Sequence, residues 1–553
     1  MKIEQATANV QLNERAVNIH IGEVETRPEA AVTFSQSDHH LGHRLQVRIT
    51  PNPTIRIDRC QITIPATLRA SDLLLCNGFQ SWTDTRWLHP TGHLPKLRRI
   101  ARPLMGYYGD YHIPWITRKK GHLHSWSWTE WHDASDEITF LGSLNENTAF
   151  TCFQWQFNQQ ALVIEADCRG LEIDQPFVAL DFLVLRSTTD QVYDTWTAAL
   201  QLPPLRAQAA RGWTSWYQHY VNISEDIILD NLRAYQARPD EIDFFQIDDG
   251  YQTAVGDWLS VREQFPNGMG KVASDIRDAG YTPGLWLAPC VADKRSKTLA
   301  KHPEWLSKTP QNRPIKAGYN PLWGGWYYAL DTEHPSWRDY TQGVFETVTK
   351  DWGFGLLKLD FLFAACLYPT RTQTRAQRMR SALEFIHGAA GGAYLLGCGT
   401  PLASGFGLFD YCRIGADIHL SWEHQLLRWF WHRERVSTLV ALRTTLARWP
   451  LAGRVWRNDP DVYLLREDNI QLSRDERALV QRVNTLAGEL LFTSDNVGTY
   501  GDWQLAEEAW QREWFEITTQ AITPTNESVT EIRTANGSFR VELGSARGSI
   551  TKL

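Results

Sequence analysis

The feature that most constrains this chain is an alternation of apolar, strand-like runs with amphipathic helical stretches from Arg211 to Asp495. Such a rhythm is typical of parallel strands joined by helices. Eight strands in a segment of this length favour a (β/α)8 barrel over an open sheet, and no glycine-rich nucleotide loop follows the first run. The eight runs are Arg211–Gln218, Ile242–Asp249, Thr282–Pro289, Gly355–Leu362, Ala393–Gly399, Tyr411–Asp417, "AGRVWRND" and "GELLFTSD".

The segments on either side of this barrel have the pattern of short strands. Up to about Leu185, runs such as "HRLQVRITP" and "RIDRCQITIP" predict a β-sandwich domain over residues 1–190. A helical stretch and the pair Pro203 and Pro204 predict a linker, with the barrel at 205–498. Short runs return past Gly501 and predict a small β domain over 503–553.

Composition excludes several classes of partner. Of the 553 residues, 56 are Lys or Arg and 63 are Asp or Glu, and the net charge of −7 argues against binding to nucleic acid. No apolar run reaches the roughly 18 residues of a membrane span, so no membrane partner is expected. The N-terminus has no apolar signal segment and the eight cysteines are scattered, which predicts a cytoplasmic protein with free thiols.

The residues that close the apolar runs of the predicted barrel are unusually acidic. In barrels of this kind the active site lies at the C-terminal ends of the strands, so these residues are candidates for chemistry. They are Asp248 and Asp249 in the second run, Lys358 and Asp360 in the fourth, and Arg413 and Asp417 in the sixth.

Asp360 and Asp417 are the candidate catalytic carboxyls. Lys358 and Asp360 are two residues apart on one strand and face the same way, so the ammonium favours an ionised, nucleophilic Asp360; a buried ion pair is the alternative. Asp417 supplies a second carboxyl, and two carboxyls facing one glycosidic bond are the minimum for hydrolysing an acetal. Alternatively, Asp417 caps a following helix.

The remaining polar candidates suit the binding of a sugar. Asp248 and Asp249 are pure acceptors when ionised and can hold neighbouring hydroxyls, although an Asp turn before glycine is the simpler alternative. Arg413 is long enough to bridge a carboxylate or a hydroxyl, with a strand-end salt bridge as its alternative. No metal is expected, because the histidines at 122, 124 and 132 lack matching ligands.

Aromatic residues complete the predicted pocket. Trp213 in the first run, Trp286 in the third and Trp82 in "NGFQSWTD" could stack on a sugar ring, although core packing explains most tryptophans. Cys398 closes the fifth run and is a further lining candidate, without a base beside it that would make it a nucleophile.

Taken in order, these pieces resemble the alpha-galactosidases of glycoside hydrolase family 36, also called the melibiase family. The resemblance runs from Asn77 to Asn496, about three quarters of the chain. The matching pieces are "NGFQSW", "GWTSWY", "FQIDDGYQ", "GLWLAP", "HPEWL", "LLKLDF", "GCGTP", "CRIGAD", "RVWRNDPD" and "LLFTSDN".

The resemblance implies a fold and a set of roles. The fold is an N-terminal β-supersandwich, a central (β/α)8 barrel and a small C-terminal β-sandwich. The activity is retaining hydrolysis of terminal alpha-galactosyl residues, as in melibiose and raffinose, without a cofactor. The implied roles are Asp360 as nucleophile, Asp417 as acid/base, Asp248 and Asp249 at O4 and O6 of galactose, Trp286 near O4, Lys358 and Arg413 at ring hydroxyls, and Trp82 and Cys398 near the sugar.

Other functions stay open on the sequence alone. A galactosyl transferase or an alpha-N-acetylgalactosaminidase would use the same site, and a non-catalytic carbohydrate-binding protein would use only its binding residues. A metal-dependent hydrolase would need histidine ligands at the strand ends, where none occurs. The oligomeric state, the preferred linkage and the pH optimum are undetermined.

Overall fold

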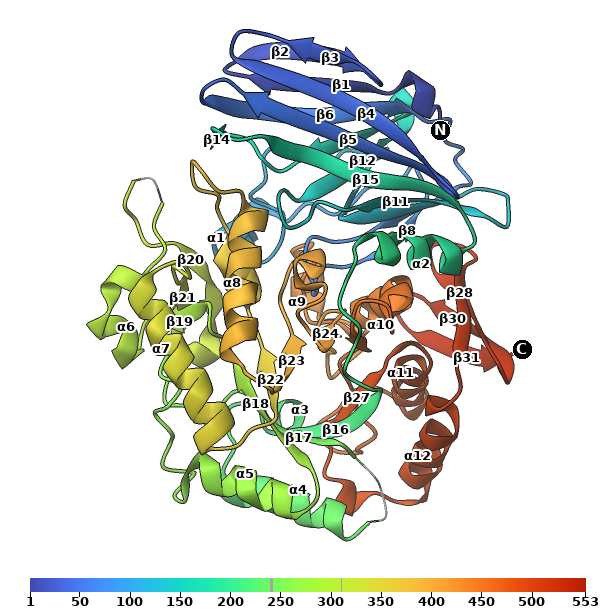
Figure 1. Cartoon of the computed structure of the whole chain (residues 1–553). Helices are drawn as coiled ribbons and strands as arrows, with labels where there is room; N and C mark the ends of the chain where they lie inside the picture. Colours follow the sequence, from blue (N-terminus) through green and yellow to red (C-terminus); the bar gives the residue numbers. More distant parts are fainter. Residues whose placement is uncertain (239–241, 310) are drawn as a thin grey trace.

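Two antiparallel sheets stack above a central parallel sheet (Figure 1). The computed structural model describes residues 1–238, 242–309 and 311–553. The first sheet has the order β2 (Arg15–His20), β1 (Thr7–Leu12), β6 (Ile55–Pro65), β13 (Ala161–Ala166), β12 (Thr151–Gln156) and β9 (His122–Trp126), with β14 (Leu171–Ile173) paired to β6. The second has the order β3 (Val24–Thr26), β4 (Ala30–His39), β5 (Gly42–Pro51), β15 (Phe177–Ser187), β11 (Ile138–Ser143), β10 (Trp128–His132), β7 (Leu73–Cys76) and β8 (Arg86–Leu88).

These two sheets pack face to face because their strands alternate between apolar and polar residues. In β1 the side chains of Ala8, Val10 and Leu12 are buried, while those between them are partly exposed. The rings of Phe153 on β12 and Phe182 on β15 meet at 5.9 Å and join the two layers. A separate hydrophobic core therefore fills the N-terminal part of the chain.

The central sheet is entirely parallel and curls until its ends meet. It consists of β16 (Ala210–Thr214), β17 (Phe244–Ile247), β18 (Thr282–Leu287), β22 (Leu356–Leu359), β23 (Tyr394–Gly397), β24 (Tyr411–Arg413), β25 (Arg457–Asp459), β26 (Val462–Tyr463) and β27 (Leu490–Thr493).

Closure of the sheet depends on its seventh strand, which is split in two. β25 pairs with β24, and β26, which follows after only Pro460 and Asp461, pairs with β27. Proline has no N–H for a ladder, so the strand breaks there. Because β27 also pairs with β16, the curled sheet returns to its first strand, and the predicted parallel central sheet is confirmed.

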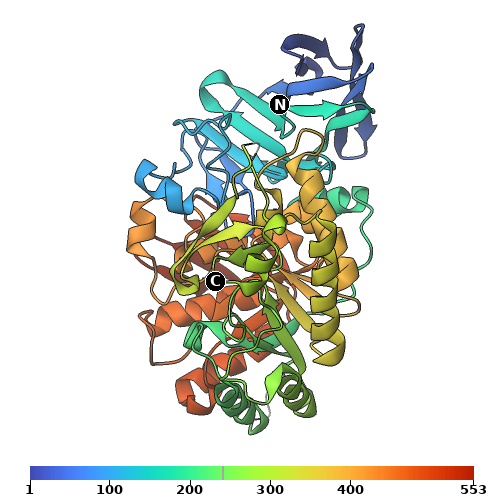
Figure 2. The ribbon, with the colours of Figure 1, turned by 90° about the vertical axis from the view of Figure 1, so that its left-hand side faces the viewer.

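Helices cover the outside of this sheet, as Figures 1 and 2 show. The longer ones are α4 (Glu225–Gln236), α5 (Gly268–Asp278), α7 (Pro335–Glu346), α8 (Arg375–Ala389), α10 (Thr438–Arg448) and α11 (Arg474–Ala487). Short helices are α1 (Arg102–Met105), α3 (Trp216–His219), α6 (Lys297–Lys301) and α9 (Gln425–Trp429). A small sheet of β19 (Val291–Asp293), β21 (Gly325–Ala329) and β20 (Lys316–Asn320) is inserted after β18. None of the helices in the described residues has the length and apolarity to cross a membrane.

Two local expectations need correction. The first run was expected to stay extended to Gln218, but β16 ends at Thr214 and the next residues form α3. The alternative that Asp417 caps a helix is wrong, since the chain stays irregular after Asp417 and α9 begins only at Gln425, capped by His424.

The C-terminal part also differs from the expected β-sandwich. Residues of "EWFEITTQAI", expected to be a strand, lie partly in the helix α12 (Asp502–Phe515). A single four-stranded sheet follows, made of β28 (Thr519–Pro524), β29 (Val529–Thr534), β30 (Gly537–Leu543) and β31 (Gly548–Lys552). Trp514 packs edge-on against Phe539 of β30 at 4.9 Å, so α12 covers this sheet where a sandwich would place a second one.

The helix α2 (Thr189–Ala199) fastens the N-terminal sheets to the barrel, and Trp196 is its anchor. The indole is fully buried, donates to the Ser143 carbonyl at 2.9 Å and packs on Phe140 and on Phe406 of the barrel. Trp196→Ala should therefore lower the free energy of unfolding by about 3–5 kcal/mol, as measured by urea denaturation. Trp429→Ala, at a half-exposed indole, is the matched control, and an equal loss in both would contradict the anchor role.

Candidate active site

Three carboxyl side chains follow three strands of the barrel at the same rim. Asp248 comes directly after β17, Asp360 after β22, and Asp417 four residues after the end of β24. Parallel strands end on one side of the barrel, so the three side chains lie at the same end. The carboxylates of Asp360 and Asp248 both raise the pKa of Asp417, which shows that the three groups interact. The sequence prediction that these residues share one site is consistent with this placement.

Asp360 is held by two hydrogen-bond donors. Its Oδ2 accepts from Trp286 Nε1 at 3.1 Å and its Oδ1 from the Phe361 N–H at 2.9 Å. Phe361 has a φ of 54°, in the left-handed region that bulky residues rarely adopt. Its ring contacts Trp82 and Trp323, which supports this turn. The buried carboxylate therefore has a fixed position.

Lys358 is paired with Asp248 in this structure, where the sequence suggested Asp360. Its Nζ donates to Asp248 Oδ2 at 2.8 Å, and the same oxygen accepts from Gln246 Nε2 at 2.8 Å. Burial by itself lowers the pKa of Lys358, but the Asp248 carboxylate outweighs it and the pKa is raised. The ammonium thus stays charged between β22 and β17, and Asp360 acts on it as a further, weaker partner.

Asp249 faces different partners from Asp248, as expected for consecutive residues. Its two oxygens accept from Gln252 Nε2 at 2.6 Å and from Trp323 Nε1 at 2.8 Å. Burial raises the pKa of Asp249 to about 6. The turn that follows requires Gly250, whose φ is 125° and where a Cβ would lie 2.9 Å from the backbone of the loop before α4.

One guanidinium, that of Arg413, connects three carboxylates. Nη1 lies 2.8 Å from Asp417 Oδ1, Nε 3.0 Å from Asp459 Oδ2, and Nη2 2.7 Å from Asp461 Oδ1. Tyr217 donates its hydroxyl to Asp461, and burial raises the pKa of Asp461 to about 7. Asp459 and Asp461 were not among the sequence candidates, although the "NDPD" motif at the seventh strand was the available signal.

Asp417 differs from Asp360 in its surroundings. Its side chain is 36% exposed and touches Arg413. Its partial burial raises the pKa of Asp417; the Asp360 and Asp248 carboxylates raise it further, against the lowering effect of Arg413 and Lys358. One rim therefore carries a carboxylate fixed by donors and a second, more accessible carboxyl that tends to keep its proton.

Of the other candidates, Trp82 and Cys398 lie close to this rim and Trp213 does not. Trp82 reaches from the N-terminal part, and its Nε1 lies 3.3 Å from Cys398 Sγ. Burial raises the pKa of the Cys398 thiol, so it is neutral. Trp213 stacks on Phe245 at 4.4 Å, and Phe245 contacts Tyr235 of α4, which places both rings between the barrel and its helices.

The sequence is similar to known glycosidases. The Melibiase family model matches residues 213–388, from β16 to α8. An alpha-galactosidase from Geobacillus stearothermophilus is 30% identical over 142 residues, which are 24% of this chain and 18% of the relative. A type blood alpha-D-galactosamine galactosaminidase from Flavonifractor plautii is 28% identical over 213 residues, 34% of this chain and 19% of that relative. The chain thus aligns with about a fifth of the length of these relatives.

Similarity to solved structures extends over nearly the whole chain. An alpha-galactosidase from Thermus thermophilus, in complex with p-nitrophenyl alpha-D-galactopyranoside, is 25% identical with a TM-score of 0.72, over 96% of this chain and 98% of that one. An alpha-galactosidase from Geobacillus stearothermophilus, in complex with raffinose, has a TM-score of 0.60 at 12% identity, over 97% of this chain and 80% of that one, and shows the fold alone. Asp417 lies beyond the family-model match.

Proposed function

We propose that the chain belongs to the melibiase family, glycoside hydrolase family 36, and is a retaining alpha-galactosidase acting on alpha-galactosyl oligosaccharides such as melibiose and raffinose. The family-model match over residues 213–388 and the similarity in fold support this proposal. The observation that carries the proposal is the pair of unlike carboxyls at the barrel rim. Asp360 is buried and accepts two hydrogen bonds, while Asp417 is partly exposed with a raised pKa. This division suits a nucleophile and an acid/base.

In the first step the Asp360 carboxylate attacks the anomeric carbon, and Asp417 gives its proton to the leaving oxygen. The carbon–oxygen bond to the leaving group breaks as a covalent galactosyl ester forms on Asp360. In the second step the ionised Asp417 takes a proton from water, which attacks the same carbon and releases Asp360. Two inversions give net retention of configuration. The mechanism needs no cofactor.

Recognition of the sugar falls to the residues around this pair. Asp248, fixed by Lys358, and Asp249, fixed by Trp323, present carboxylate oxygens to neighbouring hydroxyls such as O4 and O6. Trp286 adds an indole face beside Asp360. Arg413 lies beside Asp417 and supplies donors for a ring hydroxyl, while Trp82 and Cys398 bound the pocket from the N-terminal side.

The domain assignment follows the family in the same proposal. Residues 1–190 would form the N-terminal supersandwich, 205–498 the catalytic barrel and 503–553 the C-terminal domain. The face-to-face sheets and the curled parallel sheet support this assignment. A cytoplasmic location stays a prediction from the sequence.

Release of p-nitrophenol from a panel of glycosides tests the proposal. We expect turnover of the alpha-galactoside and little of the alpha-glucoside or beta-galactoside. The alpha-galactosaminide and alpha-N-acetylgalactosaminide belong in the panel, because one relative is named for a galactosamine substrate. Preference for either amino sugar would favour that second candidate, and product formed only with a sugar acceptor would indicate a transferase. No turnover of any of them would contradict a glycosidase.

The raised pKa of Asp417 predicts the alkaline side of the pH profile. The proton on Asp417 is needed for the first step, so kcat/KM should fall as the pH rises through this pKa, above the ordinary carboxyl value of about 4. The measurement is kcat/KM for an aryl alpha-galactoside against pH. Asp417→Asn, measured at its residual rate on the same aryl alpha-galactoside, should lose this alkaline limb. A limb that persists unchanged in the variant would contradict the assignment.

A further inference from the structure

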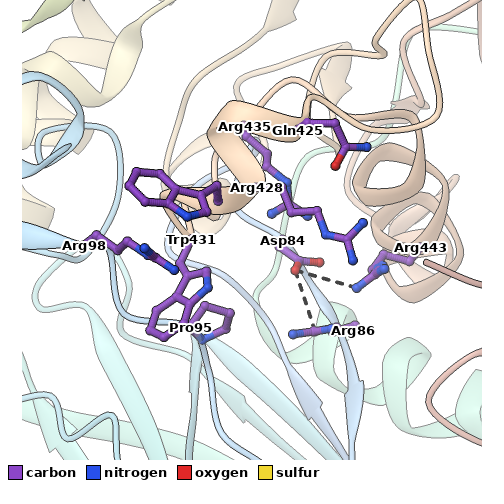
Figure 3. Close-up of a pocket in the computed structure, with 10 residues that line it drawn as sticks. Asp84, Arg86, Pro95, Arg98, Gln425, Arg428, Trp431, Arg435 and Arg443 are labelled. Atoms are coloured by element: carbon purple, nitrogen blue, oxygen red, sulfur yellow. Dashed lines mark ion pairs between the residues drawn. The ribbon is translucent and has the colours of Figure 1, made fainter. Parts of the chain in front are cut away.

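A pocket of about 410 Å3 lies between the N-terminal domain and the segment that follows β24 (Figure 3). None of its lining residues belongs to the carboxylate cluster at the barrel rim. One lining residue is acidic, Asp84, which ends the loop carrying Trp82. Five lining residues are arginines: Arg86, Arg98, Arg428, Arg435 and Arg443.

Asp84 neutralises only part of this charge. Its Oδ2 lies 3.6 Å from Arg86 Nε and 3.9 Å from Arg443 Nη1, the two ion pairs drawn in Figure 3. Both separations are longer than a hydrogen bond, and Arg86 Nε and Asp84 Oδ1 have no hydrogen-bond partner among the described residues. Asp84 is therefore shared between two guanidiniums and satisfies neither.

The other three arginines are unequally compensated. Arg435 is paired with Glu423 through two hydrogen bonds of 2.9 and 2.8 Å. Arg428 donates to the carbonyl of Ser545 at 3.3 Å, and within the part of the chain that the structure describes neither it nor Arg98 has a carboxylate in ion-pair distance. When Asp84 and Glu423, the partner of Arg435 outside the lining, are counted against the five lining arginines, three positive charges remain.

The effect of this excess appears at Arg443. Burial lowers the pKa of Arg443 to about 10; the Asp84 carboxylate opposes this, and the neighbouring Arg86 and Arg435 lower it further. Guanidiniums that repel one another in this way are stabilised when an anion enters between them.

Two indoles form one wall of the pocket. The Arg98 guanidinium lies 4.1 Å from the Trp429 ring centre and 5.1 Å from that of Trp431. These contacts hold the guanidinium in place while leaving its N–H groups available. Trp429 and Trp431 are 50% and 48% exposed, so flat apolar surface lies beside the charges.

We propose that this pocket binds a phosphate or sulfate group, either free or carried on a sugar. The N–H groups of a guanidinium match the spacing of the oxygens in such anions. A group with two negative charges neutralises more of the three excess positive charges than a carboxylate does. The volume lies within the range of about 300–1,000 Å3 usual for small-molecule sites. Neutral galactosides have no group that would use this charge, so the site goes beyond the proposed activity.

Isothermal titration in a low-salt, phosphate-free buffer tests the proposal. The probes are inorganic phosphate, sulfate, glucose 1-phosphate and, as the neutral sugar, glucose. We expect the anions to bind and the double variant Arg98→Gln/Arg428→Gln to weaken their binding by about tenfold or more. The matched control is Arg15→Gln/Arg233→Gln, which removes two charges at strongly exposed positions elsewhere. Circular dichroism checks that each variant is folded.

Each outcome decides the proposal. Tighter binding of glucose 1-phosphate than of phosphate, lost in the Arg98/Arg428 variant, supports a sugar-borne anion and the indole wall as its partner. Equal binding of the two, also lost in that variant, supports a free anion. Absence of heat with every anion overturns the site. So does binding that both double variants weaken equally, because that would reflect net charge alone.

Discussion

Asp360→Ala should lower kcat on an aryl alpha-galactoside on the order of 10⁴-fold, while the protein stays folded. The carboxylate is the proposed nucleophile, held by the Trp286 indole and the Phe361 N–H. Alanine leaves nothing in that position to form the ester. The measurement is single-turnover and steady-state release of nitrophenol, with the variant's circular dichroism as the check on folding.

The control is Asp351→Ala, an exposed carboxylate on the segment that leads into the same strand, which should keep full activity. Azide gives a second readout. In Asp360→Ala it should occupy the space of the lost carboxylate, attack from that side and yield beta-galactosyl azide. Near-full activity without azide, or an alpha-configured product, would disprove the role of Asp360.

Asp417→Ala should lower kcat/KM by about 10²–10⁴-fold on natural oligosaccharides, whose leaving groups need a proton. The loss should be much smaller for a dinitrophenyl galactoside, since its leaving group departs without protonation. The contrast between the two substrates is the measurement, because a general loss of structure would affect both equally.

Azide should act differently on Asp417→Ala than on Asp360→Ala. The galactosyl ester on Asp360 still forms, and azide attacks it from the opposite side to give alpha-galactosyl azide. Equal losses on good and poor leaving groups, or a beta-configured azide, would contradict an acid/base role for Asp417. Galactosyl azides of opposite anomeric configuration from the Asp360 and Asp417 variants would show which residue is the nucleophile and which is the acid/base.

Much of the barrel is predictable from the sequence because buried parallel strands form continuous apolar runs. Each of the eight predicted runs overlaps one strand, in the predicted order, and of the described strands of this sheet only the short β26 lies outside them. The break at Pro460, the inserted sheet around Lys316–Asn320 and the helix α12 were missed. Strands of two to five residues are too short to show a periodic pattern of apolar residues. In α12 the last residues belong to a strand-like run, which obscured the helical spacing of the apolar residues before it.

The location of the candidate residues at one rim was predictable where position along a strand decides it. Location at a strand end indicated Asp248, Asp360 and Asp417. Which side chains on different strands form ion pairs could not be predicted from their spacing in the sequence. Lys358 was expected beside Asp360 from their separation of two residues, but its ammonium reaches across β18 to Asp248. Trp213 faces the outer helices because the pleat of β16 turns it that way, and a single sequence does not show on which face a run begins.

Trapping the covalent intermediate tests the central claim most directly. A fluorinated galactosyl fluoride with a good leaving group and a slow second step should accumulate as an ester, and mass spectrometry of the digested protein should find it on the peptide containing Asp360. The label should be absent after competition with galactose. A label on another carboxylate, or steady turnover by the wild type with inversion of the anomeric centre and no label, would contradict a double displacement through Asp360.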